Sequence, residues 1–322
     1  MAEPIFLKPV LHEKMWGGTA IREQFGFDLP SETTGEAWIV SGHPNGVSPI
    51  ETEKYASMTL AQLWQARPDL FDNNDPERPY PLLVKFLDAN KDLSVQVHPG
   101  DAYAAEHNNG ELGKTESWYI LAATPDAQIY FGHNAKTKAE FNEMVDNGEW
   151  DKLLRKEPVK AGDFYYVPAG TLHALGAGVL AIETQQSSDV TYRVYDFDRP
   201  DPETGVLREL HLEDAKNVTT IPFTPAAPEQ SVVTMGALKK TTLVAAPYFS
   251  VFKVEVNGDA YFTKQAPYTQ ATVISGSGSI TIERKEYPLA LGQSFIIPAH
   301  AAEWQISGDL TIISSTPGPL SR

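Results

Sequence analysis

The chain has 322 residues, more than one ordinary hydrophobic core requires, and this length suits two domains. It contains no cysteine, which excludes disulfides and thiolate ligands, so a metal site would need histidine, carboxylate and amide groups. The formal net charge of −16 opposes binding to nucleic acid and to anionic membranes, and any phosphate site would need its own cluster of positive side chains.

Short β-strands dominate the predicted secondary structure, so the expected fold class is mostly β. Aromatic and β-branched residues are plentiful, long helical periodicities are scarce, and the 23 glycines and 24 prolines exceed one residue in seven. No apolar segment approaches the roughly 20 residues that span a bilayer, and the N-terminus lacks the pattern of a signal peptide. We therefore expect a cytoplasmic protein.

A strand with a polar face is predicted downstream of a short helix. The helix begins at Thr59, which opens a capping-box pattern. Residues 93–98 alternate strictly between apolar and polar, which places Ser94, Gln96 and His98 on one face of a strand. Three polar side chains therefore point in the same direction.

The next predicted strand, residues 117–122, begins beside a carboxylate. Glu116 stands at the start of this strand, and Lys114 shares its face. A second capping-box pattern then joins Thr137 to Glu140 and predicts another helix. Both predicted helices are interpreted as structural.

A segment bounded by glycine and proline occurs once in each half of the sequence. Gly162 and Pro168 enclose five residues typical of an apolar strand, and Gly292 and Pro298 enclose five more. The two halves are therefore predicted to share one architecture. Between them, the proline-rich residues 221–231 are typical of an extended linker.

The first copy continues to Gly170 and His173, so residues 162–173 fit the pattern G-x5-P-x-G-x2-H. This pattern is the second signature motif of the cupin barrels, which the chain resembles. The resemblance implies two cupin-type jelly-roll β-barrels with a few short helices. Residues 1–225 would form a metal-binding domain with an N-terminal extension, and residues 226–322 would form a second barrel.

The second copy departs from the motif. Glu303 stands at the position that matches His173, and His300 at the one that matches Gly170, so this barrel is expected to lack the metal site. Residues 275–279, SGSGS, are predicted to form a hairpin turn, since a phosphate loop would require a following helix.

Four polar side chains of the first half form a reasonable set of metal ligands. His98 and His173 offer imidazoles from two strands, Glu116 offers a carboxylate, and Gln96 offers an amide oxygen. Two imidazoles and a carboxylate suit zinc, and they also suit iron(II). On spacing alone, a structural role for the two histidines at the barrel mouth is an equally good interpretation.

Several longer sequence segments carry a closer family resemblance. The segments LSVQVHP, GKTE, VPAGTLHAL, LAIETQQ and VTYRVYD, with MWGG at residues 15–18 and SGHPNG at residues 41–46, are similar to the short bacterial form of the type I mannose-6-phosphate isomerases. That family consists of zinc-dependent cupins, and the resemblance spans most of the chain. The long forms carry a helical insertion, which is absent between Glu116 and His173 here.

The resemblance implies one zinc ion per chain and a set of catalytic and substrate-binding side chains. The implied zinc ligands are Gln96, His98, Glu116 and His173. The expected catalytic residues are Arg193, Glu183 and Lys114, and the expected substrate contacts are Lys85, Ser94 and Trp16. Lys85, Lys114 and Arg193 would supply the local positive charge that a phosphate site needs in this acidic chain.

The implied reaction interconverts mannose 6-phosphate and fructose 6-phosphate through an enediol-type intermediate, with zinc and Arg193 stabilising the developing negative charge. The proton carrier stays open between Glu183, which ranks first, Lys114 and zinc-bound water. The alternatives are a non-catalytic phosphosugar-binding cupin and a cupin isomerase of a different sugar. A small sugar phosphate is the expected ligand, and the sequence leaves a monomer and a homodimer equally open.

Overall fold

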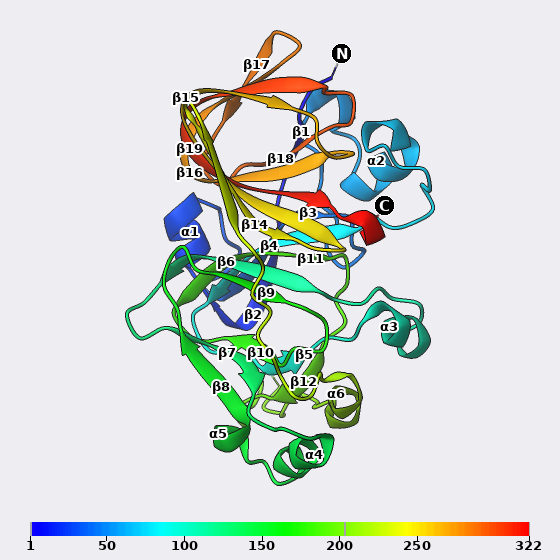
Figure 1. Cartoon of the computed structure of the whole chain (residues 1–322), viewed down its shortest axis with the longest axis vertical. Coiled ribbons are helices and arrows are strands. Elements are labelled where there is room, and N and C mark those ends of the chain that lie inside the picture. The colour runs from blue at the N-terminus through cyan, green and yellow to red at the C-terminus, as the bar shows by residue number, and fades with distance from the viewer. Residues whose placement is uncertain (1, 203, 322) are drawn as a thin grey trace.

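Three antiparallel β-sheets build two barrels that lie one above the other along the long axis of the molecule (Figure 1). The computed structural model describes residues 2–202 and 204–321. Strands dominate and the helices are short, which confirms the prediction of a mostly β fold.

The first barrel consists of a 6-stranded and a 5-stranded sheet that enclose one apolar core. The order in the larger sheet is β2 (Val10–Gly18), β3 (Thr34–Ser41), β4 (Leu82–Ala89), β11 (Val179–Gln186), β6 (Glu116–Ala123) and β9 (Phe164–Val167). The order in the smaller sheet is β12 (Tyr192–Tyr195), β5 (Val95–Val97), β10 (His173–Leu175), β7 (Gln128–His133) and β8 (Leu154–Pro158).

Strand β5 is shorter than predicted, but its alternation is as expected. Val95 and Val97 are fully buried in the core of the first barrel. Ser94 and Gln96 face the other way and line a polar cavity. The predicted polar face of this segment is therefore confirmed.

The second barrel is formed by one 8-stranded sheet. Its order is β1 (Ile5–Leu7), β18 (Ser294–Ile297), β16 (Thr269–Ile282), β19 (Glu303–Pro317), β15 (Phe249–Thr263), β14 (Leu238–Ala245) and β13 (Ser231–Met235), with β17 (Lys285–Leu289) paired to β16. The N-terminal strand thus joins this barrel, and Ile5 lies opposite Ile296. The boundary between residues 225 and 226 stays a prediction.

The predicted hairpin turn at residues 275–279 is wrong. These residues lie inside β16, and Gly278 pairs with Gly308 of β19. A bulge shifts the register just before them, and Gly276 has a positive φ of 72°. A Cβ at either glycine of this segment would overlap the backbone of β19. The glycines therefore permit a bulge and a close approach of two long strands. Both features select glycine, as a tight turn does, so the local sequence did not distinguish them.

The helices of the described part of the chain are short and lie outside the sheets. They are α1 (Ala20–Phe25), α2 (Leu60–Ala66), α3 (Asp101–His107), α4 (Lys138–Asp146), α5 (Trp150–Leu153) and α6 (Leu212–Val218), with 3-10 turns at Glu53–Tyr55, Pro68–Leu70 and Pro319–Ser321. None of these helices has the length and apolar character needed to cross a bilayer.

The two helices predicted from capping patterns are α2 and α4. Thr59 caps α2 with the complete box, as expected. At α4, Thr137 accepts a hydrogen bond from the backbone N–H of Glu140. The carboxylate of Glu140 accepts instead from the backbone N–H of Lys136, so the second box is only half formed.

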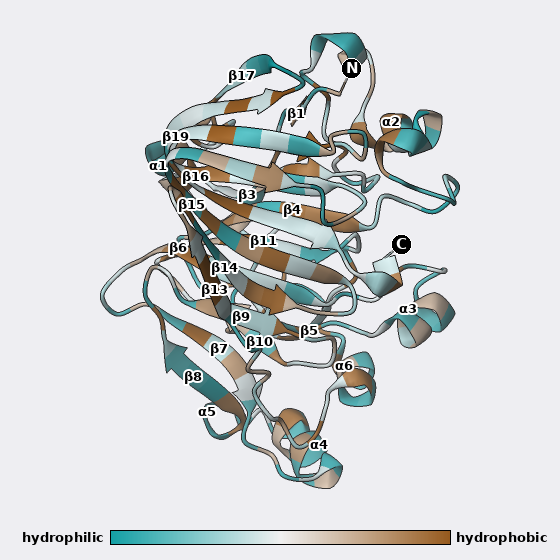
Figure 2. Cartoon of the chain, turned by 45° about the horizontal axis from the view of Figure 1, so that its top comes forward, coloured by the Kyte–Doolittle hydropathy of each residue, from teal (hydrophilic) through white to brown (hydrophobic). Residues whose placement is uncertain are grey.

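One hydrophobic core spans the junction of the two barrels. It contains Ile39 and Phe86 from the first barrel together with Phe249 and Ile296 from the second. Figure 2 shows apolar and hydrophilic residues alternating along many strands, as expected for sheets with one face against a core. The barrels are therefore packed against each other through apolar side chains.

The predicted linker, residues 221–231, is extended but rests on the first barrel. Phe223 packs edge-on against Phe131, with 5.5 Å between ring centroids. It also lies over Gly132, where any Cβ would overlap the phenyl ring. The start of this segment is thus fixed by packing before the chain enters β13.

Candidate metal centre and active-site cavity

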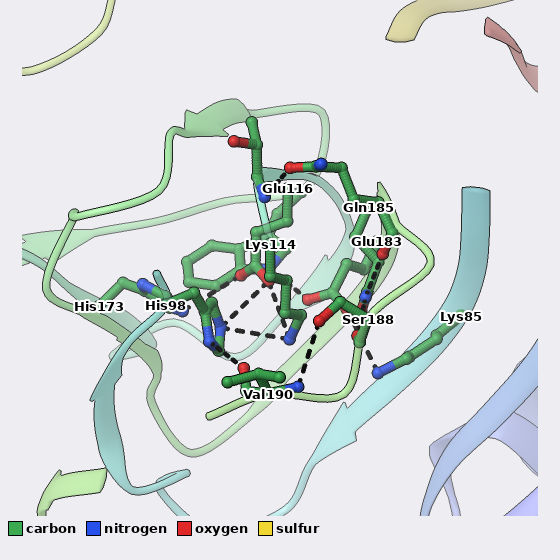
Figure 3. A network of polar contacts seen from close by, with 12 residues as sticks. Lys85, His98, Lys114, Glu116, His173, Glu183, Gln185, Ser188 and Val190 are labelled. Atoms are coloured by element: carbon green, nitrogen blue, oxygen red, sulfur yellow. Dashed lines mark hydrogen bonds and ion pairs between the residues drawn. The ribbon is translucent and has the colours of Figure 1, made fainter. Parts of the chain in front are cut away.

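Three buried side chains converge inside the first barrel (Figure 3). His98 follows β5, Glu116 opens β6 and His173 opens β10, and none is more than 1% exposed. Oε1 of Glu116 lies 3.2 Å from Nε2 of His173, and Oε2 lies 3.4 Å from Nε2 of His98. One potential ligand atom from each residue lies within 4.8 Å of the other two.

Strand register in the smaller sheet places His173 and Arg193 on either side of Gln96. His173 of β10 lies opposite Gln96 of β5, and Arg193 of β12 lies opposite the same glutamine on its other side. Directly opposed residues of neighbouring strands share a face of the sheet. Side chains from three distant parts of the sequence therefore lie side by side on one face of the smaller sheet.

The arrangement has the chemistry of a cation site. Nδ1 of His98 lies 2.9 Å from the carbonyl of Val190, and Nδ1 of His173 lies 2.8 Å from that of Thr171. Each Nδ1 therefore donates its proton, which leaves the Nε2 lone pairs directed at Glu116. Oε1 of Glu116 and Nε2 of His173 are buried without a hydrogen-bond partner among the described residues, and Oε2 of Glu116 forms an ion pair with Lys114. A divalent cation between them would satisfy these lone pairs.

Lys114 adds a positive charge to this cluster. Its Nζ lies 3.1 Å from Oε2 of Glu116 and 3.2 Å from Nε2 of His98. Burial opposes the charge of Glu116, but Lys114 and the two histidines hold its pKa well below the usual range. Burial and Lys114 lower the pKa of His98 to about 3, which keeps this imidazole neutral and able to bind a metal.

Lys114 is itself held in the charged form. Burial disfavours the ammonium group, but Glu116 and Glu183 raise its pKa above the usual value. A lysine acts as a base only when its pKa is depressed. The protein charges around Lys114 therefore make it a fixed cation.

A polar cavity of about 260 Å³ opens beside the buried cluster. Seven of the ten predicted site residues line it: Trp16, Lys85, Ser94, Gln96, Lys114, Glu183 and Arg193. The other three, His98, Glu116 and His173, form the buried cluster. Lys114 contacts this cluster and also lines the cavity. The structure therefore brings all ten predicted residues into one region.

Glu183 occupies the wall of the cavity between two neighbouring strands. It lies directly opposite Lys85 of β4 and Trp118 of β6. Nε1 of Trp118 donates a 2.9 Å hydrogen bond to Oε2, and Nζ of Lys85 lies 3.7 Å from Oε1. Burial and the nearby Glu116 raise the pKa of Glu183, which suits a group that takes up and returns a proton.

Two arginines line the same cavity. Nε of Arg193 donates to Oγ of Ser94 at 3.3 Å, and one terminal nitrogen donates to the carbonyl of Glu209 at 2.9 Å. Arg208 forms two 2.7 Å hydrogen bonds with the carboxylate of Asp196. Two oriented guanidinium groups thus provide local positive charge in an acidic protein.

Sequence reasoning assigned no role to several residues of the cavity. These are Lys14, Glu36, Asp189, Thr191 and Arg208. Thr191 has the same strand parity as Arg193, which was a usable signal. Lys14 and Glu36 lie on strands whose neighbours could not be identified from local patterns, and Asp189 and Arg208 lie in connections whose path is set by the fold.

Comparison with known proteins decides the family. A model described as phosphomannose isomerase type I, catalytic domain, matches residues 5–141, and a model of the mannose-6-phosphate isomerase cupin domain matches residues 239–317. The mannose-6-phosphate isomerase of Streptococcus mutans is 49% identical over 315 residues, covering 98% of each chain. The chain belongs to the mannose-6-phosphate isomerase family. The predicted family, the cupin fold and the assignment as an isomerase are confirmed.

Other members of the mannose-6-phosphate isomerase family agree. ManA of Bacillus subtilis is 47% identical over 306 residues, which are 95% of this chain and 96% of that protein. A crystal structure of the mannose 6-phosphate isomerase from Bacillus subtilis has a TM-score of 0.94 and 45% identity, covering 98% of this chain and 99% of that chain. The apo enzyme of Salmonella typhimurium has a TM-score of 0.77 at 16% identity, which shows a common fold.

Proposed function

We propose that the chain interconverts mannose 6-phosphate and fructose 6-phosphate with one zinc ion bound by Gln96, His98, Glu116 and His173. The observation that carries this proposal is the buried group of potential ligand atoms, of which Oε1 of Glu116 and Nε2 of His173 lack a hydrogen-bond partner among the described residues, next to a cavity lined by cations. Neutral imidazoles with one carboxylate suit zinc, which keeps an open position in catalytic sites. The named activity of the relatives supports this substrate.

The residues of the chain would orient the substrate and stabilise charge. When bound, the metal would supply a Lewis acid for the substrate oxygens. Arg193 is held by Ser94 and the carbonyl of Glu209, and its remaining N–H groups would stabilise the negative charge on the C1 and C2 oxygens. Lys114, a fixed cation, would act in the same electrostatic role.

Glu183 is the preferred proton carrier. Conversion of the aldose to the ketose moves a proton from C2 to C1, which one base can perform if it first takes and then returns the proton. The raised pKa of Glu183 and its place on the cavity wall support this role. The held charge of Lys114 makes that residue a weaker candidate.

Arg208 would bind the phosphate group. Asp196 engages Nε and one terminal nitrogen of Arg208, which leaves the other terminal nitrogen for an anion in the cavity. Lys85, Ser94 and Trp16 stay predicted substrate contacts. The cavity of about 260 Å³ is large enough for a phosphorylated hexose to enter in part.

Metal content and turnover of three variants test the proposal. We expect His98→Ala to lose its metal, because one imidazole ligand is removed. Arg193→Ala should keep about one equivalent of metal and lose about 10²- to 10³-fold in turnover. Arg155→Ala is the matched control, because Arg155 lies on β8, does not line the cavity, and contacts Glu157 and the ring of Phe223.

The readouts are metal analysis of the purified proteins and a coupled assay with mannose 6-phosphate and with glucose 6-phosphate. Chelation should abolish activity, and added zinc should restore it. Normal turnover in Arg193→Ala would refute its catalytic role, and full activity after chelation would refute the metal. Faster turnover of glucose 6-phosphate would assign the enzyme to a different sugar.

A further inference from the structure

The second barrel encloses a cavity of its own, separate from the cavity already described. It has a volume of about 250 Å³ and lies among β14, β15, β16, β18 and β19. Both halves of β15 contribute, since Phe252 and Phe262 line the same space. The long strands therefore curve around this cavity, and Figure 1 shows them bending together at one side of the upper barrel.

Aromatic rings form much of the wall. The lining rings are those of Phe252, Phe262, Phe295 and Trp304. Phe262 and Trp304 are paired across β15 and β19, with nearly parallel rings whose centroids are 5.8 Å apart. Such a wall favours a flat apolar ligand, because rings prefer offset-stacked and edge-on contacts.

A lysine side chain also lines this cavity. Lys240 of β14 lies opposite Val254, whose side chain is buried in the second barrel. Its neighbour Lys239 lies opposite Glu255 on the outer face and forms a 3.1 Å ion pair with it. Because side chains alternate along β14, Lys239 lies on the outer face with a carboxylate partner and Lys240 lies on the inner face.

Lys240 has no carboxylate partner in the part of the chain that the structure describes. Its Nζ lies 4.1 Å from the ring centroid of Phe252, which also lines the cavity. Burial alone lowers the pKa of Lys240, with no acidic group opposing the shift. Most charges that are removed from water in proteins are paired, and this chain has an excess of carboxylates.

Hydroxyl groups lie on the same inner face as the lysine. Ser314 is directly opposite Phe252, and Thr316 is directly opposite Ser250. Ser250, Ser314 and Thr316 all line the cavity, and their side chains form no hydrogen bond with another described residue. They are therefore free to donate to an acidic ligand.

We propose that the second barrel binds a small aromatic carboxylate, with its ring among the aromatic side chains and its carboxylate against Lys240 and the hydroxyls. A dry cavity of about 150 Å³ suffices for benzene, so about 250 Å³ accommodates one ring with a short acidic side chain. The opposite charge of the ligand would compensate the unpaired ammonium group. This site is independent of the isomerase reaction.

Phenylacetate is the probe for this site. Isothermal titration of the full-length protein should show saturable 1:1 binding of phenylacetate. The uncharged 2-phenylethanol should bind about 10- to 100-fold more weakly, because it lacks the charge-assisted bond to Lys240. The cationic 2-phenylethylamine should not bind. Titrations are repeated with saturating fructose 6-phosphate, so that binding of phenylacetate in the first barrel is blocked.

Two lysine variants form a matched pair. Lys240→Met removes the charge and keeps a side chain of similar length. It should weaken the binding of phenylacetate by about 10- to 100-fold and leave the affinity for 2-phenylethanol unchanged. Lys239→Met should bind phenylacetate as the unaltered protein does. Both variants should keep full isomerase activity, which shows that they are folded. Ala271→Phe, which fills the cavity, should abolish binding of both compounds.

Several outcomes would overturn the proposal. These are the absence of saturable binding, equal binding of the carboxylate and the alcohol, and unchanged binding in Lys240→Met. Complete displacement of phenylacetate by fructose 6-phosphate would also overturn it, since the carboxylate would then occupy the cavity of the first barrel. Retained binding in a folded Ala271→Phe variant would place the ligand elsewhere.

Discussion

The buried carboxylate of Glu36 is paired with lysines from two neighbouring strands. The carboxylate of Glu36 lies 3.2 Å from Nζ of Lys14 and 3.7 Å from Nζ of Lys85, and it accepts a 2.6 Å hydrogen bond from Nε1 of Trp38. Burial opposes this charge, but Lys85 and Lys14 lower the pKa of Glu36 to about 2. The wall of the active-site cavity therefore contains an ion cluster that also stabilises the fold.

Glu36→Gln should remove a pH-dependent part of the stability. Because the folded pKa is below the unfolded one, the stabilisation is present above about pH 5 and is lost as the pH falls toward about 2. We expect the variant to be about 3 kcal/mol less stable at neutral pH and to approach the unaltered protein in acid. Urea unfolding of the chelated proteins across this pH range measures the difference.

The control for this measurement is Glu32→Gln. Glu32 forms an exposed pair with Arg22, so its replacement should change stability little at any pH. A difference between Glu36→Gln and the unaltered protein that stays constant with pH would contradict the prediction.

Arg208→Gln should weaken substrate binding more than it slows the chemical step. The guanidinium group of Arg208 is held by Asp196 at the cavity wall, where it would contact phosphate in substrate and transition state alike. Loss of a charge-assisted hydrogen bond corresponds to an increase of about 10- to 100-fold in KM, with kcat nearly unchanged. Steady-state kinetics with mannose 6-phosphate measure this, and an unchanged KM would exclude the phosphate role.

At the scale of secondary-structure elements, glycines shape the second barrel. Gly258 of β15 and Gly278 of β16 both pair with Gly308 of β19, so three long strands carry glycine at the same level. Gly276 adds a positive φ and lies where a Cβ would overlap the backbone of Asp309. Residues 275–279 are therefore rich in glycine because β16 bulges there and lies close to the backbone of β19. The chain does not reverse direction at this point.

A pair of glycine variants separates backbone strain from steric overlap. Gly236 in the β13–β14 connection also has a positive φ, but a Cβ there would meet no neighbouring atom. Gly236→Ala should therefore cost about 1 kcal/mol, and Gly276→Ala should cost about 3 kcal/mol or more because overlap is added. Urea unfolding of both variants measures this, and equal costs would contradict the overlap at Gly276.

At the scale of the whole molecule, the two barrels are joined by a common hydrophobic core and by the strand β1. Ile5 and Leu7 of β1 lie in the core at the junction, and β1 completes the sheet of the second barrel. Leu243 and Ile313 extend the same core from the other side. Separation of the barrels would expose this apolar surface, which favours their unfolding as one unit.

Full-length protein should unfold in one cooperative transition, and loss of β1 should destabilise that entire transition. Deletion of residues 2–8 removes one strand of the second barrel and part of the shared core, so the thermal midpoint of both barrels should fall together. Differential scanning calorimetry measures this. Two resolved transitions, of which only one responds to the deletion, would show that the barrels are independent.

Local sequence patterns determined the mostly β class, the two helix starts, the polar face of residues 93–98 and the identities of the candidate ligands. These features depend on the period of a strand, on capping residues and on short motifs, all of which act over a few neighbouring positions. The roles of the site residues stay predictions from the family resemblance.

Only the tertiary structure decided which distant segments meet. Register across the sheets placed Gln96 between His173 and Arg193 and attached β1 to the second barrel. The path of the connection between β12 and α6 brought Arg208 to the cavity. The tertiary structure also set the raised pKa of Lys114 and left Lys240 without a carboxylate partner among the described residues. Pairing of strands far apart in the chain depends on the packing of the entire core, and electrostatic shifts depend on burial, so neither is encoded in any short segment.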